Sequence, residues 1–225
     1  MKYCVLSHRD GLPLAKERGL SADWRKFGMA LASITEADLI KGFEDDCRAK
    51  RERGVREPKS LSHVINDLID VRLVAAGWHR QVRLFPKKIF PRGWTLDFAS
   101  QASCSKAPNG LSCEVAFNHS EALAWILTKT ALACERNVKE KQISTRVGLV
   151  VTATQALKDA GNFDGAIGTF ESVKGYLDVM HGFLTAPIVV IGLEAPRGFV
   201  VEPVSVGDRT YGKIRLKSRL QGGSG

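Results

Sequence analysis

The sequence contains no uninterrupted apolar run near the ~18 residues that a membrane-spanning helix requires. Its first residues also lack the long apolar stretch of a secretory signal peptide. The cysteines are Cys4, Cys47, Cys104, Cys113 and Cys134, and no two of them have the CxxC spacing of a zinc site. These absences predict a reduced, cytoplasmic protein with no membrane segment and no structural zinc.

Several catalytic signatures are missing as well. No GxSxG motif is present, which argues against a serine hydrolase of the α/β type. The glycine-rich stretch 161–168 has the form GxxxGxxG without a following Gly-Lys-Ser/Thr, so it is not a phosphate-binding P-loop. The histidines show no paired spacing typical of metal ligands.

Positive charge is in excess. Lys and Arg number 33 against 24 Asp and Glu, a formal net charge of +9. A polyanion is a plausible partner, because clustered cations gain affinity by releasing the counterions of phosphates. The basic segment 48–56 fits either a solvated helix end or a phosphate-contacting loop, and the sequence favours neither.

The length of 225 residues suits a single domain over 1–220, with its core at about 60–195. The final residues 221–225, Gln-Gly-Gly-Ser-Gly, have the composition of an added linker. Apolar residues make up 44% of the chain, which is ordinary for a globular protein.

Hydrophobic periodicity predicts an α/β fold. Helices are expected at about 35–49, 61–76, 120–136, 155–160 and 169–183, and strands at 93–101, 111–118, 148–152 and 187–193, with an extended edge at 82–89. Residues 1–30 carry weak signals, and the chain after 193 indicates short strands and turns. This order predicts a central mixed β-sheet flanked by helices.

Two acidic residues occupy matching positions on the predicted hairpin. Asp97 alternates with the large apolar residues of strand 93–101, and Glu114 alternates with those of strand 111–118. Both acids are therefore expected on the non-core face, where pairing of the strands lets them approach each other. Two close carboxylates repel unless a cation neutralises them, and Mg²⁺ is commonly held by one or two carboxylates. Solvated acids on an exposed hairpin fit the same pattern.

The order of these motifs resembles a known nuclease core. Asp97, a turn, and then Glu114-Val115-Ala116 is similar to the PD-(D/E)xK motif, and the succession of elements over about 60–195 is similar to the BglII and BamHI group of type II restriction endonucleases. The resemblance implies a PD-(D/E)xK restriction endonuclease-like core and a homodimer that cuts a short palindromic site in double-stranded DNA with Mg²⁺. Asp97 and Glu114 match the two metal-binding acids.

Ala116 departs from this pattern, because it stands where the group places a third catalytic side chain. Alanine cannot donate, accept or ligate. Three explanations stay open. The alanine is an introduced substitution; or another residue is recruited from helix 61–76, which offers Asn66, Asp67 and Asp70; or the chain is a natural, non-cleaving DNA-binding homologue. Asn66 is included among the predicted catalytic residues.

The residues after the motif are candidates for DNA contact. Asn118, His119 and Ser120 match the place where the group positions side chains at the major groove, and Asn makes a bidentate contact with adenine. Capping of the following helix by Asn118 is an equally suitable role. Thr152 and Thr154, at the end of a buried strand, match a second set of base contacts. Phosphate contacts are expected from Lys and Arg on the loops, which the sequence alone does not sort.

Overall fold

The computed structural model describes residues 1–102, 109–117, 119–207 and 209–217. Its strands are β1 (Tyr3–His8), β2 (His79–Arg83), β3 (Thr95–Ala99), β4 (Leu111–Val115), β5 (Val147–Ala153), β6 (Ile188–Leu193), β7 (Phe199–Val206) and β8 (Arg209–Leu216). Its helices are α1 (Gly11–Ala15), α2 (Ser21–Ala32), α3 (Glu36–Glu52), α4 (Ser62–Ala75), α5 (Ala122–Cys134), α6 (Gln155–Ala160) and α7 (Phe170–Val179).

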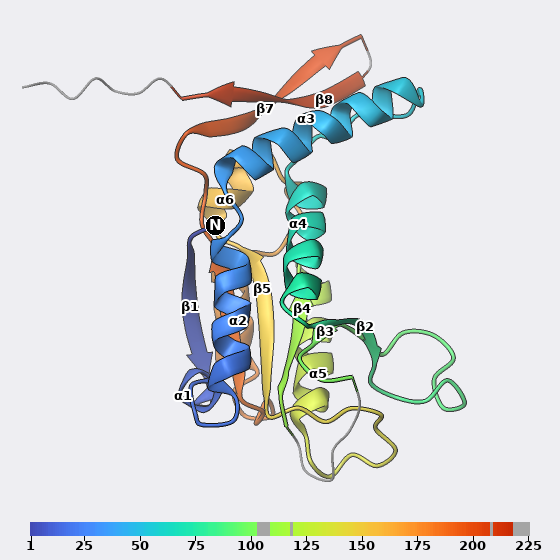
Figure 1. Ribbon diagram of the computed structural model, residues 1–225, viewed down its shortest axis with the longest axis vertical. Helices are drawn as coiled ribbons and strands as arrows, with labels where there is room; N and C mark the ends of the chain where they lie inside the picture. The colour runs from blue at the N-terminus through green and yellow to red at the C-terminus, as the bar shows by residue number, and fades with distance from the viewer. Residues whose placement is uncertain (103–108, 118, 208, 218–225) are drawn as a thin grey trace, which may run out of the picture.

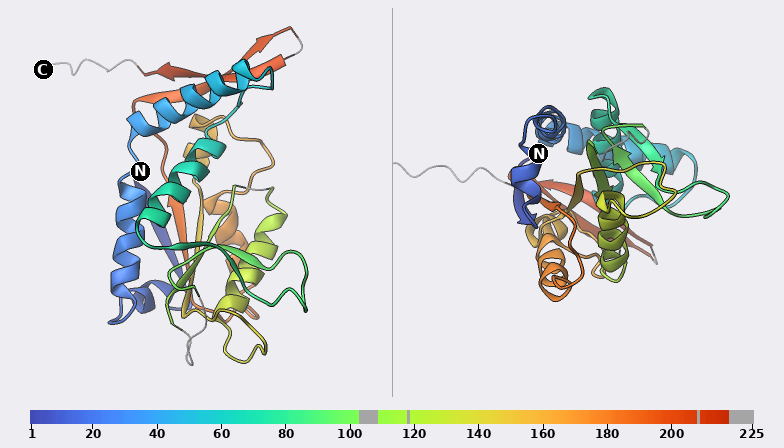
Figure 2. Two further views of the ribbon diagram at one scale, coloured as in Figure 1. Left: turned by 45° about the vertical axis from the view of Figure 1, so that its right-hand side comes forward. Right: turned by 90° about the horizontal axis from the view of Figure 1, so that it is seen from below.

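A mixed six-stranded sheet forms the centre of the molecule, in the order β1-β6-β5-β4-β3-β2 (Figure 1). β4, β5 and β6 run parallel, and the remaining neighbours are antiparallel. Helices α2 and α4 cover one face, and α5 and α7 cover the other (Figures 1 and 2). The predicted α/β class, a mixed sheet flanked by helices, is confirmed.

Local sequence explains most of these elements. Thr35 caps α3 in a capping box with Asp38, where each side chain accepts from the other residue's backbone N–H, at 3.1 and 2.9 Å. Every residue of β5 and β6 is buried, as expected for apolar runs in a parallel sheet covered on both sides. The bounds of α4, α5, α6 and α7 agree with the predicted helices to within a few residues at each end.

Two parts of the fold differ from the sequence prediction. Residues 1–30, which carry weak signals, form β1, α1 and α2, and β1 pairs antiparallel with β6 along its whole length. The segment after residue 198 forms a long hairpin, β7–β8, that lies beside α3 at one end of the molecule (Figure 1). The pairing of β1 cannot be derived from periodicity, because its partner β6 is distant in the sequence. The hairpin is local in the sequence, and what periodicity does not show is its position beside α3.

None of the helices in the described residues has the length and apolar character needed to cross a membrane. The four cysteines in the described part of the chain carry free thiols. Residues 218–225, including the linker-like tail, lie outside the described residues, as does Cys104.

Candidate active site

β3 and β4 bring the two predicted acids together. These strands pair antiparallel with Phe98 opposite Cys113 and Ala99 opposite Ser112. Continuing this register by one residue places Asp97 opposite Glu114. The ladder ends at that point, and the Asp97 carboxylate enters the gap, where its Oδ2 accepts from the backbone N–H of Val115 at 2.9 Å.

Asp97 lines a pocket at the junction of α4 with the sheet. The pocket measures about 330 Å³ and is lined by Asn66, Asp67, Asp70, Gln81, Asp97, Phe98 and Val115. Asp70 is engaged by Arg80 Nη1 at 2.9 Å, whereas Asn66 and Asp67 are exposed to solvent. The structure therefore brings the predicted residue Asn66 to the same pocket as Asp97, and it adds Gln81, which no sequence pattern indicates.

Glu114 lies behind this pocket, in the layer between the sheet and α5. It is only 3% exposed, so the expectation that it lies on a non-core face is wrong. Strand alternation correctly predicted the side of the sheet on which Glu114 lies. That side is not open to solvent, because α5 covers it with a second apolar cluster. Glu114 Oε2 lies 2.7 Å from Lys129 Nζ, and its Oε1 is buried with no hydrogen-bond partner.

Burial and the neighbouring charge of Asp97 raise the pKa of the Glu114 carboxyl from 4.5 to about 8. The charge and hydrogen bond of Lys129, and the backbone N–H of Asp97, act in the opposite direction. Two carboxylates and one ammonium thus share a poorly solvated space. Among the described residues, no three Asp, Glu, His or Cys side chains are grouped closely enough to hold a metal ion by themselves.

The family model of restriction endonuclease BglII/BglIII matches residues 24–193, most of the chain. The chain belongs to this family. It is accordingly a type II restriction endonuclease, a site-specific deoxyribonuclease. No curated protein matches it in a direct sequence comparison.

Two solved structures align with most of this chain, and the first of them has a similar fold. The crystal structure of restriction endonuclease BglII complexed with a DNA 16-mer has 13% sequence identity and a TM-score of 0.63, covering 96% of this chain and 100% of that one. The crystal structure of free BglII has 12% identity and a TM-score of 0.48, covering 96% of this chain and 93% of that one.

Position 116, where the sequence resemblance predicts a third catalytic group, is fully enclosed. Ala116 has no exposed surface and packs in the apolar cluster with Leu123, Ile126 and Leu127 of α5. Its backbone N–H donates to Val151 O at 2.7 Å. A longer polar side chain would have to displace these apolar neighbours. The alanine therefore fits its surroundings, and no polar group at this position serves the acid pair.

The predicted DNA-contacting residues have different surroundings. His119 is exposed and Ser120 half-buried, just before α5. The Thr152 hydroxyl is buried and donates to Ala116 O and Gly168 O. The Thr154 hydroxyl caps α6 and donates to Leu193 O at 2.9 Å. Both hydroxyls are thus engaged by backbone oxygens of the protein itself, and base contact by these threonines stays a prediction. Asn118 lies outside the described residues.

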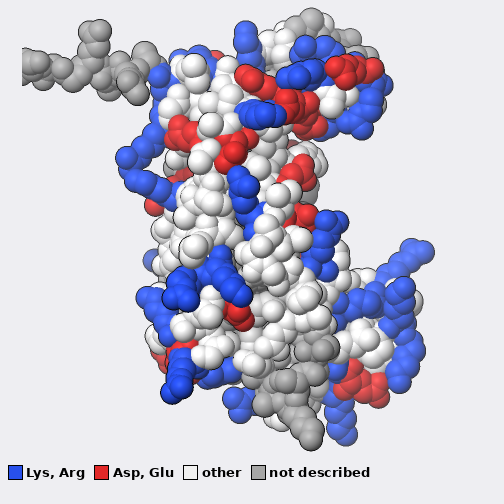
Figure 3. Space-filling view, in the orientation of Figure 1, with Lys and Arg blue, Asp and Glu red and all other residues white. Residues whose placement is uncertain are grey.

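The molecular surface is hollowed beside the pocket (Figure 3). α4, β2 and β3 form the inner wall, the end of α3 with β7–β8 projects on one side, and the loop from β2 to β3 projects on the other (Figures 1 and 2). Lys and Arg side chains occupy both projections (Figure 3). The hollow is open to solvent on the face that carries the acid pocket.

The two projections differ in how their charges are paired. At the end of α3, Arg48, Lys50 and Arg51 each contact an acidic side chain, at 2.8–3.0 Å. The other projection, residues 84–94, contains no Asp or Glu. Within the described residues, no ion pair involves its cations Lys87, Lys88 and Arg92. We call residues 84–94 the basic arm.

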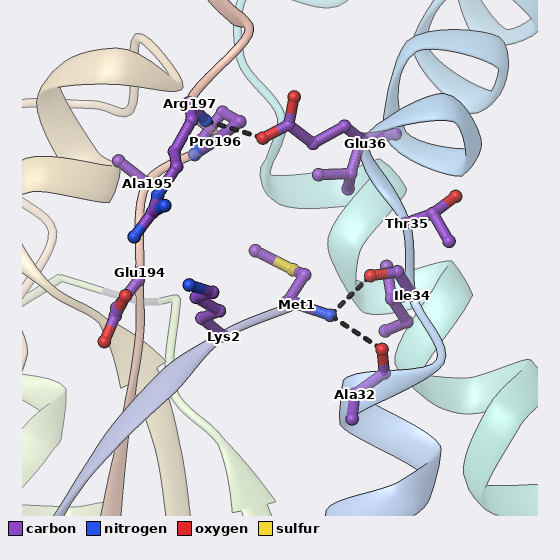
Figure 4. A pocket seen from close by; sticks show the side chains of 11 residues that line it. Met1, Lys2, Ala32, Ile34, Thr35, Glu36, Glu194, Ala195, Pro196 and Arg197 are labelled. Carbon is purple, nitrogen blue, oxygen red and sulfur yellow. Dashed lines mark hydrogen bonds between the residues drawn. The ribbon is translucent and has the colours of Figure 1, made fainter.

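A second cavity, also of about 330 Å³, lies between the N-terminus, the connection from α2 to α3, and the segment after β6 (Figure 4). Two of the charged groups that line this cavity hydrogen-bond to the backbone of other segments of the chain. The Met1 ammonium donates to Leu31 O, and the Glu36 carboxylate accepts from the backbone N–H groups of Arg197 and Gly198. It shares no residue with the acid pocket, and we assign it a structural role.

The sequence interpretation missed Lys129. It is the only charged residue of α5 and lies in an otherwise apolar run, which is an unusual position for a lysine. This single charge in an apolar helix was the signal in the sequence from which a role for Lys129 could have been inferred.

Proposed function

We propose that the chain is a Mg²⁺-dependent endonuclease that acts as a homodimer on a short palindromic site in double-stranded DNA. One observation carries the proposal: Asp97 and Asn66 line one pocket, while Glu114 lies electrostatically coupled to Asp97 directly behind it. The family to which the chain belongs supports the reaction class.

The residues present fit a magnesium ion. Asp97 and Glu114 are suitable carboxylate ligands, and the buried, unpartnered Oε1 of Glu114 lacks the donor or cation that such an atom normally has. Mg²⁺ keeps several waters and accepts phosphate oxygens, so two carboxylates suffice on the protein side. When bound, the ion lowers the pKa of a coordinated water and stabilises charge that develops on the phosphate.

The protein residues then have separate tasks. Asp97 provides negative charge at the pocket, and Glu114 would add its own charge once a bound cation displaces its proton. The Asn66 amide orients a water or a phosphate oxygen by hydrogen bonding. In the reaction, the water oxygen forms a bond to phosphorus in line with the leaving sugar oxygen, whose bond to phosphorus breaks. The water proton passes to solvent, and the sugar oxygen takes up a proton.

The basic arm is the part of the surface best suited to phosphates. Within the described residues its cations form no ion pair, and they lie on the rim of the hollow that contains the acid pocket. The exposure of His119 and the partial exposure of Ser120 support contacts of these side chains with base edges. Two copies related by a two-fold axis match the symmetry of a palindromic site.

A second function is favoured by one observation. Because Ala116 provides no polar group, a sequence-specific DNA-binding protein that does not cleave is the alternative.

The test begins with selection of bound duplexes from a random pool in Ca²⁺, which yields the recognised site without requiring cleavage. The selected duplex is then incubated with Mg²⁺ and wild-type protein or the Asp97→Asn variant. We expect cleavage by the wild type, a loss of at least about 100-fold in Asp97→Asn, and a dimer by light scattering. Selection of a site that neither the wild type nor an Ala116→Gln variant cleaves would support the non-cleaving alternative.

A further inference from the structure

Lys129 occupies a position that a lysine reaches only with strong partners. Its side chain is 12% exposed, and the paired carboxylate of Glu114 is 4% exposed. The ammonium lies 2.7 Å from Glu114 Oε2 and donates to the backbone oxygen of Thr95 at 2.8 Å. It therefore links α5 to both strands of the acid pair, since Thr95 is on β3 and Glu114 is on β4.

The contacts of Lys129 fix the Glu114 carboxylate in one orientation. With Oε2 held by the ammonium, Oε1 is the atom left without a partner. Thr95 stands two residues before Asp97 on the same strand, so the same ammonium also sets the spacing between the segments that carry the two acids. A buried ion pair contributes little net stability, because desolvation offsets the attraction. A structural role alone is a weak explanation for this lysine.

Ala116 and Lys129 are complementary in this site. Position 116, two residues after Glu114 and just past the end of β4, carries only a methyl group enclosed by apolar side chains of α5. The donor and positive charge missing there are provided from the helix that packs on the same face. We propose that Lys129 is a positioning residue that replaces the absent third group, orienting Glu114 for its role in the acid pair. This inference rests on the proposed endonuclease function and predicts that the chain with Ala116 is active.

The first measurement needs no metal. In EDTA, Lys129→Met keeps the length and apolar stem of the side chain but leaves a buried carboxyl without its cation. We expect a fall in Tm of at least about 4 °C, of which Glu114→Gln in the same chain recovers at least half. If the Tm shift of the double variant equals the sum of the shifts of the two single variants, Lys129 and Glu114 do not interact, and the proposal is overturned.

The second measurement separates positioning from folding. On the duplex selected above, Lys129→Met should lower kcat by at least about 100-fold, while Kd in Ca²⁺ changes by less than about 3-fold. Lys129→Arg retains the charge and should recover at least tenfold of that loss. The matched control is Lys141→Met, because Lys141 also donates to backbone oxygens, those of Leu132 and Ala133 at the end of α5, whereas the ion pair of Glu114 is with Lys129. It should be less stable than the wild type, with kcat unchanged.

The outcomes distinguish this inference from the proposed function. Cleavage by Lys129→Met within about 3-fold of the wild type would overturn the role of Lys129 and leave the endonuclease intact. Equal losses in Lys129→Met, Lys129→Arg and Lys141→Met would overturn it as well, in favour of a purely structural lysine. If the wild type does not cleave the duplex but the Ala116→Gln variant does, Lys129 does not replace the missing third group. That result would still support descent from an endonuclease. If neither the wild type nor the Ala116→Gln variant cleaves the duplex, both proposals are refuted.

Discussion

At the scale of single residues, the unusual pKa of Glu114 has a consequence for stability. The folded protein retains the proton of this carboxyl up to about pH 8, whereas the unfolded chain releases it near 4.5. Between these values the native state binds more protons than the unfolded state, so the free energy of unfolding falls as pH rises. The slope contributed by one group is at most about 1.4 kcal/mol per pH unit.

We therefore expect Glu114→Gln to flatten the stability profile of the metal-free protein between pH 5 and 8. Urea unfolding in EDTA across this range measures the effect. The control is Glu121→Gln, an exposed acid next to the start of α5, which should retain the wild-type slope. Parallel profiles for the wild type and Glu114→Gln would contradict the assigned pKa.

At the scale of elements, the contact between α5 and β5 decides where Lys129 lies. A Cβ added to Gly148 on β5 would approach Thr130 Cγ2 to 2.1 Å, far inside van der Waals contact. Thr130 follows Lys129 directly in α5 and is fully buried. The absence of a side chain at Gly148 thus lets α5 approach the sheet closely enough for Lys129 to reach Glu114.

Gly148→Ala should destabilise the protein by about 1–3 kcal/mol, because the core cannot accept the additional methyl group without moving α5. Thr130→Ser removes the colliding Cγ2, and the next nearest atoms lie at 3.5 Å, so the double variant should recover most of the loss. Gly165→Ala, where an added Cβ meets nothing within 4 Å, is the control. Denaturant midpoints of the wild type and of each variant measure these changes in stability. If Thr130→Ser does not restore the stability lost in Gly148→Ala, the destabilisation does not come from the contact between residues 148 and 130.

The elements that the sequence predicted are those whose signal is local. Thr35 and Asp38 form a complete helix start within four residues, and β5 and β6 are apolar runs that only a covered sheet can accommodate. β1 has no such signal. It exists because β6 offers a free edge, and because Gly11, whose Cβ would lie 2.4 Å from Ile188 O, lets α1 pack against that strand. Such dependence on a distant partner is not visible in a periodicity.

The site was predictable to the same limited extent. Alternation correctly assigned Asp97 and Glu114 to approaching positions, because it depends only on the two strands. It could not show that α5 covers Glu114, since alternation gives the face and not what packs on it. For a related reason, the sequence could not show the surroundings of Thr152 and Thr154. Their hydroxyls are used by neighbouring backbone groups that the sequence does not place.

At the scale of the whole molecule, the acid pocket and the basic arm occupy different parts of one hollow. The acid pocket lies in its wall, and the basic arm stands on its rim (Figures 1 and 3). The arm is stiffened by aromatic contacts. Phe85, Phe90 and Trp94 lie at centroid distances of 5.2 Å from one another, and Trp94 contacts Trp125 of α5 at 4.6 Å. A braced arm holds its cations in place without the entropy cost of ordering a loose loop on binding.

This arrangement predicts a difference in salt dependence between two equally charged sets of variants. Replacing Lys87, Lys88 and Arg92 with Ala should weaken binding to any duplex and reduce the slope of log K against log salt by about 2–3, because each lost phosphate contact contributes about 0.9. Replacing Arg18, Arg25 and Lys26 removes the same charge from exposed positions in and next to α2, away from the arm (Figure 1). That set should leave the slope within about 0.5 of wild type. Equal slopes for the two sets in a fluorescence titration would mean that net charge, and not the basic arm, attracts the DNA.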